Sequence, residues 1–201
     1  VLFRSWFIIG GADEYPAGVV KPIKYFGREL VAFRGENGAV VVLDAYCPHL
    51  GAHLGYGGTV EGNTLRCPFH AWRFDATGQC VEIPYAKHIP PKACTTTWLT
   101  SEVSGLVFIW HDPQGNKPDY AIPEMPEFGK EGWTGWNLNR LEIKTHPREI
   151  IENVADSAHF LYVHQMEEMI SFENIYEGHT ATQLMHGRGP GGEVKTRATY
   201  Y

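Results

Sequence analysis

Cysteine and histidine stand together twice in the first half of the chain, in short segments of similar make-up. The first segment is Cys47-Pro48-His49 and the second is Cys67-Pro68-Phe69-His70, with 17 residues between them. Each segment offers one thiolate and one imidazole, which are good ligands for transition metals. A binuclear iron–sulfur cluster can use both, because one iron takes the two thiolates and the other takes the two imidazoles. The candidate cluster ligands are therefore Cys47, His49, Cys67 and His70.

Two alternatives stay open for these four residues. They could be polar residues that fall in turns by chance, or they could form a Cys2His2 zinc site. Zinc sites usually open with two cysteines a few residues apart, a pattern that is absent here. Glycines at positions 51, 55, 57 and 58 favour the cluster, because they let backbone N–H groups approach its sulfides. We expect His53 to lie beside the loop or on the surface rather than to act as a ligand.

A second group of polar residues lies between positions 153 and 164. Asn153, Asp156 and His159 are three residues apart, so they share one face of a helix that we expect over residues 148–169. His164 follows five residues after His159, and an ideal helix would turn it about 140° away. If both histidines bind one metal, the helix must bend or end near residues 160–163. Two histidines and one carboxylate form the ligand set of non-haem Fe(II) oxygenases, although a hydrogen-bonded histidine pair is the alternative.

Composition restricts the class of protein. Apolar residues make up 43% of 201 residues, which is enough for a packed core. The net charge of −6 comes without a run of Lys or Arg, so a nucleic-acid partner is poorly supported. No apolar run approaches the roughly 20 residues of a membrane span. Four cysteines are too few for a disulfide scaffold and indicate a reducing compartment, the cytoplasm; we expect Cys80 and Cys94 to be small buried residues.

The elements that must position these residues divide the chain into three parts. Residues 1–113 read as a small antiparallel β domain, with a hairpin formed by 29–34 and 39–44 and further strands at 64–67, 72–75 and 106–110. Residues 114–132 are rich in Pro and Gly and form a linker. Residues 133–201 begin a second domain, with a strand at 136–144, the helix at 148–169 and a glycine-rich turn at 187–192. The first residues lack a Met and the last ones read as an interrupted strand, so we expect a fragment at both ends.

At its cysteine–histidine segments the chain resembles the Rieske proteins. The resemblance implies an antiparallel β sandwich whose loops bind a Rieske [2Fe–2S] cluster. Respiratory Rieske proteins carry a disulfide between these two loops, at positions that correspond to Ala52 and Phe69 here. The chain is therefore similar to the oxygenase or ferredoxin subtype.

With residues 153–164 included, the chain resembles the large (alpha) subunit of Rieske non-haem iron oxygenases. This resemblance implies that His159 and His164 bind a mononuclear Fe(II), with Asn153 near the iron. It implies that Asp156 bridges an iron-ligand histidine and a cluster histidine, His70, of a neighbouring subunit in a homotrimer. The third iron ligand would lie beyond residue 201. The second domain would be the beginning of an α+β catalytic domain, with a helix-grip type of sheet plus helices.

The implied function is that of a terminal oxygenase component, a monooxygenase or dioxygenase. An NAD(P)H-dependent reductase or a ferredoxin would supply electrons, and O2 would be used to hydroxylate or desaturate a small hydrophobic molecule. Residues 83–90 and 146–153 are similar to the 3-ketosteroid 9α-hydroxylase and cholesterol 7-desaturase branch, which implies a steroid or sterol substrate. An oxygenase or O-demethylase acting on an aromatic compound is one alternative. A Rieske ferredoxin, a pure electron carrier, is the alternative of another class.

Overall fold

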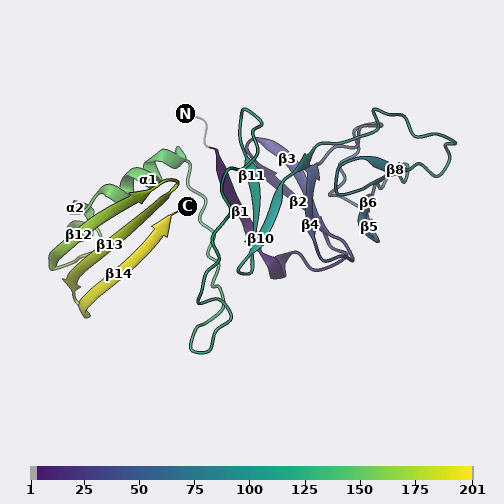
Figure 1. Cartoon of the computed structure of the whole chain (residues 1–201). Coiled ribbons are helices and arrows are strands. Elements are labelled where there is room, and N and C mark those ends of the chain that lie inside the picture. The colour runs from purple at the N-terminus through teal and green to yellow at the C-terminus, as the bar shows by residue number, and fades with distance from the viewer. Residues whose placement is uncertain (1–3, 201) are drawn as a thin grey trace. The chain divides into compact units, whose positions relative to one another are not determined.

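The structure is a computed structural model, and it describes residues 4–200, without the side chains at positions 147, 151 and 154. The start of the chain, where a truncation is expected, lies outside the described residues. The fold divides into two compact units, one ending at Leu138 and one beginning at Asn139. Figure 1 shows the elements of both units, and each unit is considered by itself. No helix within residues 4–200 is both long and apolar enough to cross a bilayer.

The first unit is built almost entirely of antiparallel strands. Its strands are β1 (Ser5–Gly11), β2 (Val20–Tyr25), β3 (Arg28–Arg34), β4 (Val40–Asp44), β5 (Thr59–Glu61), β6 (Thr64–Arg66), β7 (Arg73–Phe74), β8 (Cys80–Glu82), β9 (Thr97–Trp98), β10 (Thr100–Val103) and β11 (Leu106–His111), with a short 3-10 helix at Ala12–Glu14. They form sheets in the orders β1-β11-β10, β2-β3-β4-β9 and β5-β6-β7-β8. The predicted mainly antiparallel β architecture is confirmed.

The sheet β2-β3-β4-β9 is buried on both faces. Along β3, Leu30 and Ala32 pack into one core together with residues of β1 and β11. Val31 and Phe33 point the other way, into a core shared with the sheet β5-β6-β7-β8. Burial on both faces explains why β3 and β4 read as continuous apolar runs instead of alternating ones. The predicted β3-β4 hairpin is confirmed, with Arg34 paired to Val40 across the turn.

The first cysteine segment lies in a tight loop after β4. The Cys47 N–H donates to the Ala52 carbonyl (2.9 Å), and the Gly51 N–H donates back to the Cys47 carbonyl (2.9 Å). Gly51 has a φ of 73°, in the left-handed region. The Leu54 N–H then donates to the Ala45 carbonyl (2.7 Å), which closes the base of the loop on the end of β4.

The second cysteine segment forms a loop of the same design between β6 and β7. The Cys67 N–H donates to the Trp72 carbonyl (2.8 Å), and the Ala71 N–H donates to the Cys67 carbonyl (3.1 Å). In both loops the backbone of the cysteine is therefore hydrogen-bonded to the residues four and five positions later in the sequence. Ala71 occupies the position of Gly51 and also has a positive φ, 58°, which is a strained conformation for a residue with a Cβ.

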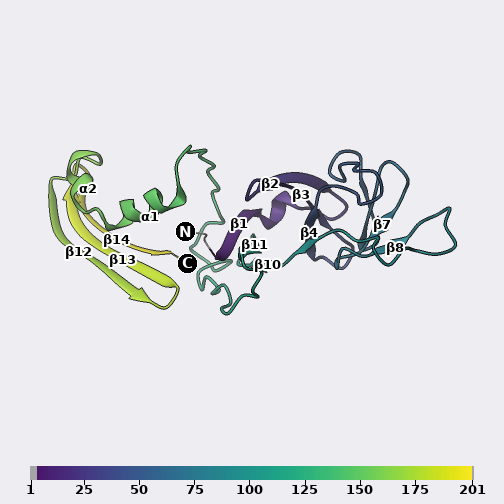
Figure 2. The same ribbon diagram turned by 90° about the horizontal axis from the view of Figure 1, so that it is seen from above.

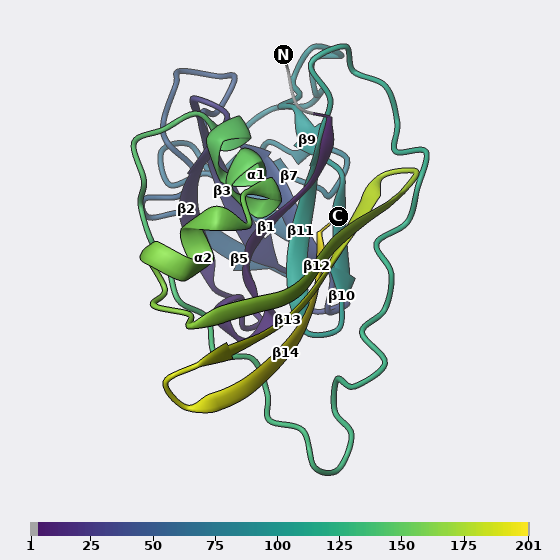
Figure 3. The ribbon, with the colours of Figure 1, turned by 90° about the vertical axis from the view of Figure 1, so that its left-hand side faces the viewer.

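The second unit combines two helices with a meander of three strands. Its elements are α1 (Pro147–Ala155), α2 (Ala158–Tyr162), β12 (Glu168–Glu177), β13 (Thr180–Gly189) and β14 (Gly192–Tyr200). The strands pair antiparallel in chain order, and Figure 3 shows them as long, twisted neighbours. Figure 2 shows the sheet curving around the side on which α1 lies. Phe160 of α2 packs on Phe172 of β12, with 5.9 Å between the ring centroids.

The predicted single helix over 148–169 is wrong, because the chain leaves the helical path at Asp156. There the backbone is extended (φ −86°, ψ 99°), and the Asp156 carboxylate accepts the N–H of Ala158 at 2.9 Å. A short polar side chain that bonds the following backbone competes with helix continuation. Asn153, Asp156 and His159 therefore do not share one helix. The expected end near residues 160–163 is confirmed, since α2 ends at Tyr162.

The strand predicted over 136–144 is also absent from the described structure. The segment has apolar residues two positions apart, at 136 and 138 and again at 141 and 143, but Leu141 and Ile143 are 81% and 53% exposed. Trp136 donates its indole N–H to the Ser104 carbonyl (2.6 Å) instead. Without a buried face and a neighbouring strand, the alternation does not produce a β-strand.

The paired loops lead to a prediction about backbone strain. Gly51→Ala places a Cβ in the left-handed region, with no other atom within 4 Å to clash, so strain is the only cost. We expect a loss of about 1 kcal/mol in the free energy of unfolding, measured by denaturant titration. Ala71→Gly is the matched control, because it relieves the same strain in the other loop and should cause no loss. Equal destabilisation by both variants would contradict the common design of the loops.

Candidate functional site

Cys47 and Cys67 lie side by side inside the core between two sheets. Their side chains are 3% and 2% exposed, and both belong to the core that also contains Leu54, Leu65 and Phe74. The two thiols interact with each other directly. The structure therefore brings together two cysteines that lie 20 residues apart in the sequence, through the matched loops that hold them.

The imidazoles of His49 and His70 also lie together. Their ring centroids are 4.7 Å apart and the rings meet edge to face. The Nδ1 atom of His70 is buried and has no hydrogen-bond partner among the described residues. A buried ring nitrogen without a partner is costly unless something else binds it. It is therefore a free ligand atom beside the second imidazole.

Trp72 positions His49. The two rings stack at 4.6 Å with an angle of 9° between their planes. The Trp72 indole N–H donates to the hydroxyl of Tyr85 at 2.8 Å, which fixes the indole. The sequence-based reasoning missed the roles of Trp72 and Tyr85, although Trp72 stands directly after the second cysteine–histidine segment.

Burial sets the protonation of the Cys47 thiol. Desolvation is the largest cause and raises the pKa of Cys47 to about 11, and the neighbouring Cys67 thiol adds to the shift, while the His49 N–H opposes it. Without a metal the Cys47 thiol is therefore protonated at neutral pH, and binding of a cation must displace its proton. A buried thiol pair, an adjacent imidazole pair and an unpartnered ring nitrogen fit the ligand set of a Rieske [2Fe–2S] cluster.

The other cysteines and His53 take the following places. Cys80 is buried, as predicted, whereas Cys94 is exposed and that prediction is wrong. Ala93 points into the core next to Cys94, so Cys94 faces outward. The Nδ1 atom of His53 accepts the N–H of Gly55 at 3.0 Å, within the turn that follows the first loop. No disulfide forms between any cysteines of the described chain.

The second unit brings His159 and His164 together. Their ring centroids are 5.2 Å apart, which is possible because α2 ends between them. The Nδ1 atom of His159 lies 2.6 Å from the Asp156 carbonyl oxygen. Since a carbonyl only accepts, this contact places the proton on Nδ1 and leaves the lone pair on Nε2 free to bind a metal.

Asp156 lies at the break between α1 and α2 and also contacts His159, the first residue of the histidine pair. Its Oδ1 accepts the N–H groups of Ala158 (2.9 Å) and His159 (3.4 Å), and its Oδ2 lies 3.6 Å from the His159 ring. The side chain is 52% exposed, so one oxygen is used for capping and the other is accessible. Asn153 is exposed, and its backbone carbonyl accepts the N–H of Asp156 (3.3 Å).

The candidate ligands are arranged in pairs. Within residues 4–200 no three His, Cys, Asp or Glu side chains are grouped around a single point. A binuclear cluster needs only two protein ligands for each iron, whereas a 2-His-1-carboxylate site needs one carboxylate more than the histidine pair supplies.

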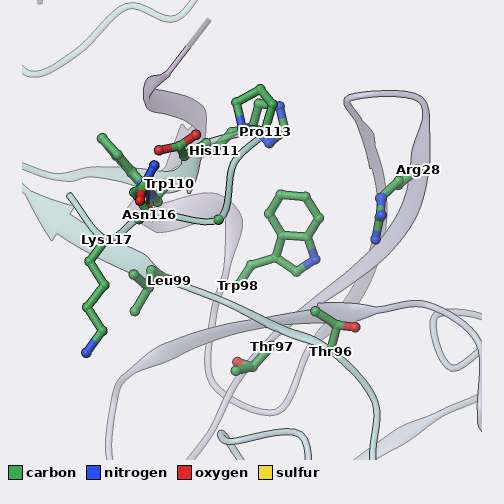
Figure 4. Close-up of a pocket in the computed structure, with 12 residues that line it drawn as sticks. Arg28, Thr96, Thr97, Trp98, Leu99, Trp110, His111, Pro113, Asn116 and Lys117 are labelled. Carbon is green, nitrogen blue, oxygen red and sulfur yellow. Dashed lines mark hydrogen bonds between the residues drawn. The ribbon is translucent and has the colours of Figure 1, made fainter. Parts of the chain in front are cut away.

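The first unit also contains open cavities away from these residues. One cavity of about 490 Å³ is lined by Arg28, Trp98, His111 and Lys117 among others, and the Trp98 ring stands at its centre (Figure 4). A second of about 500 Å³ lies beside Tyr46 and Cys94. None of the predicted metal ligands lines either cavity, and no motif in the sequence points to them.

Two protein-family models match consecutive parts of the chain, and each part contains one group of candidate metal ligands. Residues 5–97 match the Rieske [2Fe-2S] domain. Residues 109–201 match the 3-ketosteroid 9alpha-hydroxylase C-terminal domain. The first match contains the cysteine–histidine loops and the second contains the His159–His164 pair.

Known proteins are similar over most of the chain. A probable 3-ketosteroid-9-alpha-monooxygenase oxygenase component from Rhodococcus rhodochrous is 50% identical over 185 residues, which cover 90% of this chain and 46% of the relative. A cholesterol 7-desaturase from Bombyx mori is 42% identical, over 80% of this chain and 35% of the relative. The chain thus spans about half the length, or less, of these curated relatives.

A solved structure agrees with the fold. Dicamba monooxygenase bound to dicamba has a TM-score of 0.71 at 24% identity, covering 96% of this chain and 58% of that one. The two domain matches, the relatives and the fold agree. The chain therefore carries a Rieske [2Fe–2S] domain followed by a segment that matches the C-terminal domain of 3-ketosteroid 9α-hydroxylases, and it is similar to proteins named as oxygenase components.

Proposed function

We propose that the chain is part of a terminal oxygenase that hydroxylates or desaturates a steroid or sterol. The observation that carries this proposal is that each unit has its own group of candidate metal ligands. One unit has a buried thiol pair with two imidazoles, and the other has a second imidazole pair. When bound, a Rieske cluster would supply one-electron transfer and a mononuclear Fe(II) would supply O2 activation. Relatives named as a 3-ketosteroid monooxygenase component and a cholesterol desaturase support the substrate class.

In this proposal the residues of the first unit hold the cluster and protect it. Cys47 and Cys67 bind as thiolates, and their burial keeps water away. His49 and His70 bind through ring nitrogens, and stacking on Trp72 restricts the orientation of the His49 ring. Residues 1–113 form the cluster domain, residues 114–132 the linker, and residues 133–201 the beginning of the iron-binding domain.

The residues of the second unit prepare a metal site and a connection to it. His159 and His164 supply two ligands, and the Asp156 carbonyl holds the His159 ring with Nε2 free. The accessible oxygen of Asp156 would accept a hydrogen bond from His70 of the partner subunit in a homotrimer, and Asn153 would lie near the iron. The exposure of Asp156 is consistent with such a contact.

The proposal includes a separate electron donor. Relatives named as oxygenase components support a reductase on another chain, either NAD(P)H-dependent or acting through a ferredoxin. Unpaired cysteines in the described chain are consistent with the cytoplasm. Oxygenation or O-demethylation of an aromatic compound is the alternative reaction, and a pure electron carrier is the alternative function; the imidazole pair of the second unit favours an oxygenase over a carrier.

Metal analysis tests the cofactors. We expect the purified protein to contain iron in excess of acid-labile sulfide, because one iron would bind outside the cluster. Cys67→Ser should abolish the sulfide and the visible spectrum of the cluster, whereas Cys94→Ser, which changes an exposed cysteine, should preserve both. Iron equal to sulfide would favour the electron carrier, and zinc without sulfide would contradict a Rieske cluster.

Asp156 is tested by two variants that separate its roles. Asp156→Asn keeps an oxygen that can cap α2 but removes the charge, so the fold and the cluster spectrum should persist while turnover falls about 10- to 100-fold. Asp156→Ala should in addition lose about 1 kcal/mol of stability with the cap. Single-turnover kinetics and denaturant titration of the iron-loaded, full-length protein measure the two effects. Unchanged turnover in Asp156→Asn would rule out the bridging role.

The substrate class is tested by O2 consumption. We expect a 3-ketosteroid or cholesterol to stimulate O2 uptake by the reduced, full-length protein and to yield a hydroxylated or desaturated product by mass spectrometry. Dicamba serves as the aromatic comparison, since the fold is shared with an enzyme that binds it. Turnover of dicamba alone would replace the steroid proposal with the aromatic one.

A further inference from the structure

One loop beside the candidate cluster site is basic in an otherwise acidic protein. It runs from residue 84 to 92 and contains Lys87, His88 and Lys92. No Asp or Glu occurs between Glu82 and Glu102, although the whole chain has 23 acidic residues in 201. The carboxylate of Glu82, at the end of β8, is already bonded to Arg73 at 2.6 Å. The charge of this loop is therefore uncompensated by neighbours along the chain.

The loop is anchored in the core that contains the thiols but is itself outside that core. Ile83 and Ala93, at its two ends, are buried together with Cys47 and Cys67. The Cys80 N–H donates to the Ala93 carbonyl (2.8 Å), which fixes the returning chain on β8. Every residue from 84 to 92 is exposed, and Figures 1 and 2 show the chain after β8 extending away from the sheets. Because its residues are exposed, the loop is available for contact with a partner.

The loop is also connected to a candidate cluster ligand by two contacts. Tyr85 stands at its beginning, and its hydroxyl accepts the indole N–H of Trp72 at 2.8 Å. Trp72 in turn stacks on His49 at 4.6 Å. A partner that sits on the loop would therefore lie only two side chains away from the imidazole pair.

We infer that residues 84–92 form the docking surface for an acidic electron-donor protein. This inference rests on the proposed function, because it concerns the donor that would reduce the cluster. Lys87 and Lys92 would attract acidic side chains of the donor and guide it to the end of the unit where His49 and His70 lie. Charges of opposite sign at an interface mainly accelerate encounter and select orientation. Tyr85 and Ile89, in the same loop, add exposed apolar surface that can exclude water from the contact.

The experiment compares two charge-reversal variants of the cluster-loaded protein. The double variant Lys87→Glu/Lys92→Glu changes the loop, and Lys117→Glu/Lys130→Glu changes the net charge equally at exposed positions outside it. The probe is a reduced, acidic plant-type ferredoxin, and stopped-flow absorbance follows reduction of the cluster. At low ionic strength we expect the loop variant to react about tenfold more slowly than the unchanged protein and the control variant at the unchanged rate. The difference should disappear at high salt and when dithionite replaces the ferredoxin.

Three results would overturn the inference. Equal rates for the loop variant and the unchanged protein would show that the loop does not receive the donor. Equal slowing of both variants would assign the effect to net charge. Loss of binding to vesicles rich in phosphatidylserine, with normal reduction, would make the loop a lipid contact instead. Absence of the cluster spectrum from the unchanged protein would refute the proposed function itself, so the two failures are distinguishable.

Discussion

The candidate cluster site of the first unit depends on the packing of two sheets, which keeps two thiols next to each other and away from water. Burial raises the pKa of Cys47 to about 11, so this side chain is stable there as a neutral thiol or as a thiolate bound to a cation. Neither loop could hold its cysteine there alone. Each is closed by a pair of backbone hydrogen bonds at its base, and the packed sheets behind them set the separation of the two sulfur atoms.

In the second unit the two histidines come from one short segment, so the local backbone path decides whether they meet. Five residues of continuous helix would direct His159 and His164 away from each other. The chain instead interrupts the helix at Asp156 and ends it at Tyr162, and the same aspartate orients the first histidine. The break at Asp156 therefore orients His159, and the end of α2 at Tyr162 lets His164 approach it.

Local pattern was enough to predict the hairpin of β3 and β4 and to single out the cysteines and histidines that the structure brings together. Spacing and residue type carry that information, because ligand chemistry and turn chemistry are local. The helix break was missed because its cause is the Asp156 carboxylate, which accepts the backbone N–H groups of Ala158 and His159, and helix propensity does not include such bonds. The false strand at 136–144 and the exposure of Cys94 were missed because both depend on which neighbours cover a segment. The contacts of Trp72 with His49 and Tyr85 join three loops and are a property of tertiary packing alone.

The sheet β2-β3-β4-β9 has a consequence for how the first unit opens. Because its β3 strand supplies residues to both cores, loss of β3 from the sheet would disrupt both cores at once. The unit should therefore behave as one cooperative folding block in amide hydrogen exchange, with protection rising and falling together from β1 to β7. Binding of a cation at Cys47 and Cys67 would then slow exchange in β1 and β11, on the far side of that sheet.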